Sequence, residues 1–162
     1  MIIGNGGAGK STLARALAEK LKLPLHHLDK LFWLPGWKEI GRDVMNEKVL
    51  KIISEDEWII DGNYRRTIAE RAEKADTIIY LNFNTLVCLY GIVKRRLSNQ
   101  KRTDITEGCP EKIDMQFFKW VMFYNYTTAP DVRRLLHSLP AGKRVIELKS
   151  RREVREFLKN IK

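Results

Sequence analysis

Apolar residues in this chain gather in five short runs, and longer stretches with helical spacing separate the runs. Runs of this length that are rich in β-branched and aromatic residues are typical of buried strands. We predict strands at residues 2–3, 23–29, 58–61, 75–81 and 143–148. Strands that alternate with helices favour a parallel sheet with helices on both of its faces. The pattern therefore predicts a three-layer α/β protein with a five-stranded parallel sheet.

Between the runs, apolar positions recur every three or four residues, which predicts helices. The first helix begins at Thr12. Its expected apolar face is Leu13, Leu17 and Leu21. The expected apolar faces of later helices are Met45, Val49, Ile52 and Ile53; Leu86, Leu89, Val93 and Leu97; Met115, Phe118, Met122 and Tyr126; and Val154, Phe157, Leu158 and Ile161. We expect the face that begins at Met115, on a helix over residues 111–126, to be core. Ser150 and Glu153 form a capping box at the start of the last helix.

A glycine-rich segment lies between the first predicted strand and the first predicted helix. It reads Gly4-Asn5-Gly6-Gly7-Ala8-Gly9-Lys10-Ser11, is followed by Thr12, and fits the pattern G-x-x-x-x-G-K-[ST] of a phosphate-binding P-loop. Backbone N–H groups and the positive end of the following helix form an anion site in such a loop. We expect Lys10 to reach the terminal phosphates and Ser11 to offer its hydroxyl to Mg²⁺. The segment predicts binding of a nucleoside triphosphate.

Two acids end predicted strands, and we expect both near the phosphates because ligands gather at the carboxyl ends of parallel strands. Asp29 ends the second strand and Asp61 the third. Asp29 is a candidate to orient or deprotonate an acceptor hydroxyl, although an acid also suits a helix cap or a surface turn. Asp61 is a candidate to hold Mg²⁺ or one of its waters. Its alternative role is that of a structural turn residue.

The segment at about residues 30–56 is the candidate binding region for an acceptor molecule. The candidate substrate-binding residues are Asp29, Trp33, Arg42, Asn63, Tyr64 and Arg65. Trp33 belongs to an aromatic loop at residues 31–37, which either stacks against the acceptor or anchors the loop on the core. Arg42 is a candidate phosphate ligand. Arg65 could grip an acceptor phosphate with two hydrogen bonds.

Basic residues follow the fourth predicted strand. Arg95 and Arg96 lie near the end of the predicted helix at residues 85–97, and Arg102 lies in the polar stretch after it. Cations are favourable at the C-terminal end of any helix, which is the simpler explanation. The functional explanation is a small helical lid at about residues 95–112. Arginines on such a lid would close over the transferring phosphoryl group, neutralise its charge and exclude water.

Composition adds a strong positive charge to this picture. The 162 residues suit one domain, with 30 Lys and Arg against 20 Asp and Glu, and the net charge is +10. This excess favours an anionic partner, either phosphorylated small molecules or nucleic acid, and scattered solvated lysines explain part of it. No apolar run approaches the roughly twenty residues of a membrane span, and no signal-peptide pattern opens the chain. We expect a cytoplasmic protein with no membrane partner, whose two cysteines are free thiols.

Three landmarks in order resemble the adenylate-kinase-like group of P-loop kinases: the glycine-rich loop, the acid and glycine that close the third strand, and the later arginine-rich segment. In nucleoside monophosphate kinases the third strand ends in D-G-F-P-R. Here residues 61–65 read D-G-N-Y-R, and the changed middle argues against AMP as the acceptor. A closer resemblance covers nearly the whole chain. Residues 27–33 (HLDKLFW), 58–64 (WIIDGNY) and 108–111 (GCPE) resemble the bacterial topology modulation proteins, which are similar to adenylate kinase in fold.

The resemblance implies ATP binding on a single kinase-like domain over residues 1–162. We expect transfer of the γ-phosphoryl group of ATP, with Mg²⁺, to a small acceptor such as a nucleotide or nucleoside. Catalysis would rest on positioning and charge neutralisation. The expected catalytic residues are Lys10, Asp29, Arg95, Arg96 and Arg102. The alternative is an ATP-dependent regulatory protein that binds DNA, which the positive charge and the family name suggest, although no DNA-reading motif is present. A degenerate kinase is a third hypothesis, and the intact Lys10 and Ser11 argue against it.

Overall fold

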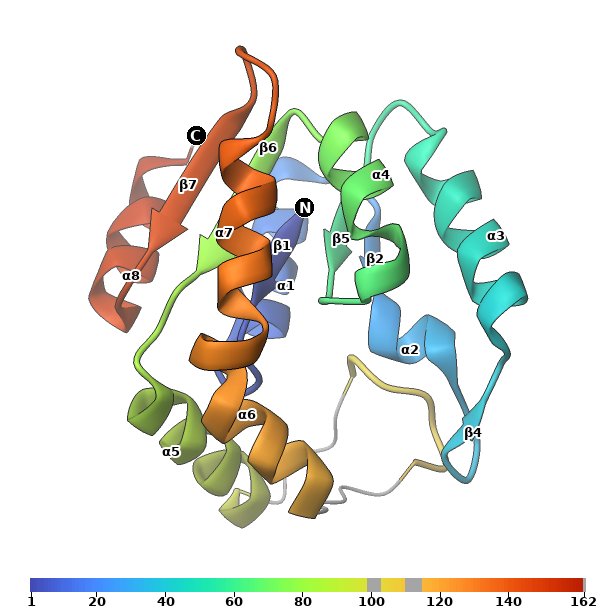
Figure 1. The fold of residues 1–162 in the computed structure, drawn as a ribbon, viewed down its shortest axis with the longest axis vertical. Helices are drawn as coiled ribbons and strands as arrows, with labels where there is room; N and C mark the ends of the chain where they lie inside the picture. The colour runs from blue at the N-terminus through green and yellow to red at the C-terminus, as the bar shows by residue number, and fades with distance from the viewer. Residues whose placement is uncertain (99–102, 110–114, 162) are drawn as a thin grey trace.

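The computed structural model describes residues 1–98, 103–109 and 115–161, and a sheet of five parallel strands forms its centre (Figure 1). The strands are β1 (Ile2–Gly4), β2 (Leu25–His27), β5 (Ile59–Asp61), β6 (Thr77–Leu81) and β7 (Arg144–Leu148). They lie in the order β2-β5-β1-β6-β7, so β1 is the central strand. All four neighbouring pairs are parallel. The predicted five-stranded parallel sheet is confirmed.

Helices cover both faces of this sheet because alternate strand residues point to opposite sides. The helices are α1 (Lys10–Leu21) and α8 (Arg151–Asn160) on one face, and α3 (Arg42–Ile53), α4 (Ile68–Lys74) and α7 (Ala129–His137) on the other (Figure 1). Ile2 packs in an apolar cluster with residues of α1 and α8. Its neighbour Ile3 packs with residues of α4 and α7, and Ile60 packs with α3. The three predicted layers are therefore present.

The predicted apolar faces of α3 and α8 are confirmed. All four predicted residues of α3 are buried, and those of α8 pack against the core. The Ser150 half of the capping box is present, since the Ser150 hydroxyl accepts a hydrogen bond from the Glu153 backbone N–H at 3.2 Å, while the Glu153 carboxylate accepts from the Lys149 N–H at 2.8 Å rather than from the Ser150 backbone N–H. On α1, Leu13 and Leu17 are buried, but Leu21 at the last position is 39% exposed.

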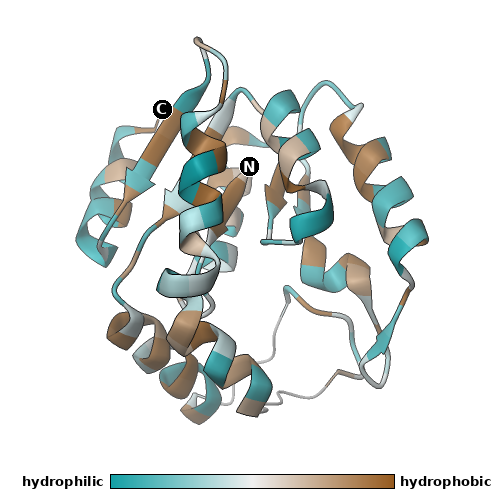
Figure 2. Cartoon of the chain, viewed as in Figure 1, coloured by the Kyte–Doolittle hydropathy of each residue, from teal (hydrophilic) through white to brown (hydrophobic). Residues whose placement is uncertain are grey.

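Helices α5 (Thr85–Leu97) and α6 (Met115–Thr127) form where helices were predicted, but most residues of the predicted inward faces are exposed, although Leu89 of α5 packs against the core. Leu86 of α5 is 74% exposed and Tyr126 of α6 is 80% exposed. Figure 2 shows apolar residues extending over both helices. The fully buried residues are instead Cys88 and Ile92 on α5 and Val121 and Tyr124 on α6.

The inward face of α5 is set by small residues because this helix packs directly against the glycine-rich loop. A Cβ atom at Gly91 would lie 2.3 Å from the carbonyl oxygen of Gly7, and a Cβ at Gly7 would lie 2.1 Å from the carbonyl oxygen of Cys88. No larger side chain fits at either glycine without moving the backbone. Leu86, Val93 and Leu97 of α5 lie on its exposed sides, whereas Ile92 is buried beside Gly7.

The second strand is shorter than predicted. It ends at His27, and Asp29 lies in the first turn of α2 (Leu28–Phe32), where an acid is favourable at the positive end of the helix. The predicted aromatic loop, residues 31–37, covers the end of α2 and the first part of an antiparallel hairpin of β3 (Trp33–Leu34) and β4 (Lys38–Glu39). Two residues that connect these strands, Gly36 and Trp37, have positive φ angles of 77° and 61°.

A short 3-10 helix at Arg65–Thr67 precedes α4. Among these helices, none combines the length and the apolar character that a membrane crossing requires.

Candidate functional site

The glycine-rich loop, residues 4–11, connects the central strand β1 to the N-terminus of α1. Gly7 and Gly9 have φ angles of 77° and 94°, in the left-handed region that favours glycine. Gly9 is exposed, and a Cβ at this position would meet nothing within 4 Å. The buried side of the loop is therefore fixed by packing against α5, while the side at the start of α1 is open.

Two asparagine side chains hold the base of the loop. The Asn5 side chain is buried, donates to the backbone carbonyl of Val121 at 3.0 Å and accepts from the Gly6 N–H at 2.8 Å. The Asn63 amide donates to the Gly4 carbonyl at 2.6 Å and accepts from the Gly4 N–H at 3.0 Å. Asn63 thus continues the pairing of β1 at a point where β5 has already ended. The predicted contact of Asn63 with substrate stays a prediction, and in the structure its side chain holds the loop.

Arg71 holds the segment that carries Asn63, a role that was not predicted from the sequence. Its guanidinium is fully buried and donates to the carbonyl oxygens of Gly62 at 2.9 Å and Tyr64 at 2.7 Å. Burial lowers the pKa of Arg71 to about 10, and the nearby carboxylates of Glu70 and Asp61 oppose this shift. One feature of the sequence could have indicated this role: an arginine stands on the otherwise apolar inward face of α4.

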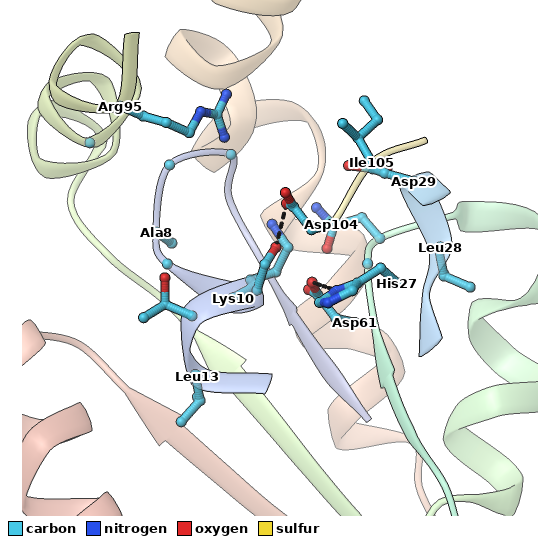
Figure 3. Close-up of a pocket in the computed structure, with 18 of the residues that line it drawn as sticks. Ala8, Lys10, Leu13, His27, Leu28, Asp29, Asp61, Arg95, Asp104 and Ile105 are labelled. Atoms are coloured by element: carbon cyan, nitrogen blue, oxygen red, sulfur yellow. Dashed lines mark hydrogen bonds and ion pairs between the residues drawn. The ribbon is translucent and has the colours of Figure 1, made fainter. Parts of the chain in front are cut away.

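The open side of the loop faces a cavity of about 1300 Å³. Basic residues that line it are Lys10, Arg15, Lys94, Arg95 and Arg151. Acidic residues that line it are Asp29, Glu39, Asp61 and Asp104. Figure 3 shows Lys10 and Asp61 in the middle of this cavity, with Arg95 and Asp29 on opposite sides of them. The cavity thus brings together most of the residues that were predicted from distant parts of the sequence.

Lys10 and Ser11 both make hydrogen bonds at the mouth of the loop. The Lys10 ammonium donates to the carbonyl oxygen of Asn5 at 3.1 Å. The Ser11 hydroxyl donates to a carboxylate oxygen of Asp104 at 2.8 Å (Figure 3). Asp104 was not predicted as a site residue, because the segment between α5 and α6 has no periodicity that would place it over the loop.

His27 and Asp61 form a buried pair at the ends of two neighbouring strands. They are register partners between β2 and β5, and Nδ1 of His27 lies 2.9 Å from Oδ2 of Asp61. The second carboxylate oxygen, Oδ1, is buried and has no hydrogen-bond partner among the described residues. Buried polar atoms are normally satisfied, and a carboxylate oxygen is a hard ligand suited to Mg²⁺ or to one of its waters. This oxygen fits the role predicted for Asp61.

In the described part of the chain, no three His, Cys, Asp or Glu side chains gather into a group that could hold a metal ion. Mg²⁺ in nucleotide sites usually takes only one or two carboxylates and keeps phosphate oxygens and waters as further ligands. Ser11, Asp61 and Asp104 supply oxygen donors of this kind on the cavity wall.

Three predicted arginines do not line the cavity. Arg42 is the exposed first residue of α3, Arg96 is exposed on α5, and Arg65 forms an ion pair with Asp131 of α7. Arg102 lies outside the described residues. Gly4 and Asn5 form the base of the loop, whereas the remaining loop residues and Asp29, Trp33, Asn63, Tyr64 and Arg95 line the cavity.

Residues 103–109, which are part of the predicted lid, make hydrogen bonds to both the glycine-rich loop and the β3–β4 hairpin. Beyond the contact to Ser11, the Thr106 hydroxyl donates to the Lys30 carbonyl at 2.9 Å, and the Cys109 thiol donates to the Leu34 carbonyl at 3.2 Å. This part contains no helix. The rest of the predicted lid beyond α5, at residues 99–102 and 110–112, lies outside the described residues.

No model of a known protein family matches this chain, and a search of curated proteins finds no relative of it.

Proposed function

We propose that this chain is a P-loop phosphotransferase that moves the γ-phosphoryl group of ATP to a small acceptor, with Mg²⁺ as its cation. The glycine-rich loop is the observation that supports this proposal most strongly. It joins the central strand to the first helix, and its open side, with Lys10 and Ser11, faces a cavity of about 1300 Å³. Ligands of open α/β sheets bind at this edge, at the carboxyl ends of the strands.

The phosphates of ATP would bind at the start of α1. The loop N–H groups and the positive end of this helix attract anions there. The Lys10 ammonium would exchange its contact with the Asn5 carbonyl for a stronger, charge-assisted bond to a phosphate oxygen. Arg95 of α5, the helix that packs against the loop, would neutralise charge that develops on the transferring group.

Ser11 and Asp61 would hold Mg²⁺, directly or through water, and Asp104 is a third oxygen donor near Ser11. The ion would neutralise part of the negative charge of the phosphates. The hydrogen bond from His27 fixes the Asp61 carboxylate, so that its second oxygen keeps one orientation. Asp29, on the far side of the cavity from Arg95 (Figure 3), would orient the acceptor hydroxyl and accept its proton.

ADP release tests this proposal, measured with purified protein, ATP, Mg²⁺ and a panel of nucleosides, nucleotides and small metabolites. We expect Lys10→Ala to lower turnover about tenfold to a hundredfold, since a hydrogen bond to a charged group contributes about 1.5–3 kcal/mol. Lys48→Ala is the matched control because Lys48 is exposed on α3, away from the cavity. Circular dichroism verifies that both variants fold. Full turnover by Lys10→Ala, or no ADP release with any acceptor, contradicts the proposal.

A further inference from the structure

The basic residues that line the cavity lie around the glycine-rich loop, where Asp61 and Asp104 also lie, and the charged residues described on the other side of the cavity are all acids. The five basic lining residues come from α1, α5 and α8, which surround the glycine-rich loop. Asp29 of α2 and Glu39 of β4 come from the segment between β2 and α3. We call this region, Asp29 to Glu39 together with Tyr64, the acceptor side. In the described residues, no Arg or Lys of the acceptor side lines the cavity.

The acceptor side also carries a continuous aromatic wall. The rings of Phe32 and Trp33 lie 4.8 Å apart between centroids, those of Trp33 and Trp37 lie 5.4 Å apart, and those of Phe32 and Tyr64 lie 5.8 Å apart. All four residues line the cavity. Aromatic faces favour flat, apolar partners through stacking and edge contacts.

Trp37 adds a second indication that this wall binds a ligand. Its φ angle of 61° lies in the left-handed region, where a bulky side chain is uncommon and costs conformational energy. Glycine is the usual residue at such a position of a short hairpin loop. Strained residues of this kind cluster at ligand-binding sites. Tryptophan at this position therefore favours a binding role over a purely structural one.

The arginines that would recognise a phosphate on the acceptor lie elsewhere. Arg42 does not line the cavity, and Arg65 pairs with Asp131 on α7. A phosphate group on the acceptor side would instead face the carboxylates of Asp29 and Glu39, and like charges repel, although both residues are exposed and water weakens this repulsion.

We propose that the acceptor is a nucleoside-like alcohol: a flat ring that carries a hydroxyl group and no phosphate. This inference rests on the proposed phosphotransferase function. In the transfer, the acceptor hydroxyl oxygen bonds to the γ-phosphorus, and the bond from that phosphorus to the bridging oxygen of ADP breaks. ADP keeps the electron pair of this bond, and the hydroxyl proton passes to the Asp29 carboxylate.

The test compares nucleosides with their own 5′-monophosphates. Adenosine, guanosine, cytidine and thymidine, each beside its monophosphate, are titrated into the protein while a non-hydrolysable ATP analogue and Mg²⁺ occupy the loop. Tryptophan fluorescence reports binding. We expect a nucleoside to bind about tenfold or more tightly than its monophosphate. Equal or tighter binding of the monophosphates, or binding of no nucleoside, overturns the inference. Failure of the ATP analogue itself to bind instead contradicts the proposed function.

Trp37→Gly separates binding from folding. Glycine suits the left-handed backbone at this position, so we expect an unchanged melting temperature and about tenfold weaker nucleoside binding from loss of the ring. The control is Phe123→Ala, an exposed aromatic residue of α6 that does not line the cavity. Nucleoside binding by Trp37→Gly at the wild-type affinity overturns the role of the aromatic wall.

Discussion

Asn63 connects the end of β5 to the glycine-rich loop, and its removal should destabilise the whole protein. Its side-chain amide makes both a donor and an acceptor contact with the backbone of Gly4, at 2.6 and 3.0 Å. Gly4 is buried. Asn63→Ala would leave the N–H and the carbonyl of Gly4 without these partners on that side of the central strand. The same change would loosen the root of the loop that we propose binds phosphate.

The size of the effect follows from these two contacts. A buried polar group that loses its partner costs about 1–3 kcal/mol. Asn63 is half-buried and lines the cavity, so water from the cavity replaces part of the lost hydrogen bonding to Gly4. We therefore expect Asn63→Ala to lower the free energy of unfolding by about 2–3 kcal/mol, a large part of the roughly 5–15 kcal/mol typical of a domain.

Urea denaturation followed by circular dichroism measures this change. Asn63→Asp is the sharper variant, because it has nearly the same shape but presents an acceptor where the amide donated to the Gly4 carbonyl. We expect it to destabilise the protein at least as much as alanine does. Asn160→Ala, at the exposed end of α8, is the control. A loss below about 0.5 kcal/mol for both Asn63 variants, the range of ordinary surface changes, would refute the reasoning.

Two further predictions concern the loop glycines and the last helix. Gly7→Ala should destabilise the protein more than Gly9→Ala, because a Cβ at Gly7 would meet a backbone carbonyl whereas the space at Gly9 is open. The melting temperatures of the two variants test this prediction. Equal decreases in melting temperature would contradict the packing argument. Hydrogen bonds from the Lys149 N–H and the Ser150 hydroxyl lower the pKa of Glu153 below its ordinary value of 4.5. A lowered carboxyl pKa contributes stability above the unfolded value that is lost as pH falls through the folded value. Acid titration of the melting temperature should therefore show a smaller loss below pH 4.5 for Glu153→Gln than for the wild type, and identical acid profiles would count against this account.

The sheet and several helices could be predicted because their signals are local. The strand around Ile78 is an apolar run that is buried on both faces, and the spacing of Met45 and Val49 marks the single inward face of α3. The glycine-rich loop carries its own pattern of residues, so its position between β1 and α1 was also predictable. Each of these features depends on neighbouring residues in the sequence.

The features that were missed depend on contacts between distant segments. The inward face of α5 is decided by the approach of Gly7 to Gly91, where size matters more than hydrophobicity. The roles of Asn63 and Arg71 depend on β5 ending before β1 does, which leaves backbone groups for side chains to satisfy. The contact of Asp104 with Ser11 spans 93 residues. Periodicity contains no information on any of these pairs.

Titration of the protein with ATP and Mg²⁺, followed by calorimetry, tests the central claim most directly. We predict one binding site per chain, with affinity reduced about tenfold to a hundredfold in Lys10→Ala, because a charge-assisted hydrogen bond to phosphate is lost. Lys48→Ala should bind like the wild type. Absence of ATP binding, or binding that Lys10→Ala leaves unchanged, would contradict the assignment of the glycine-rich loop as the phosphate site.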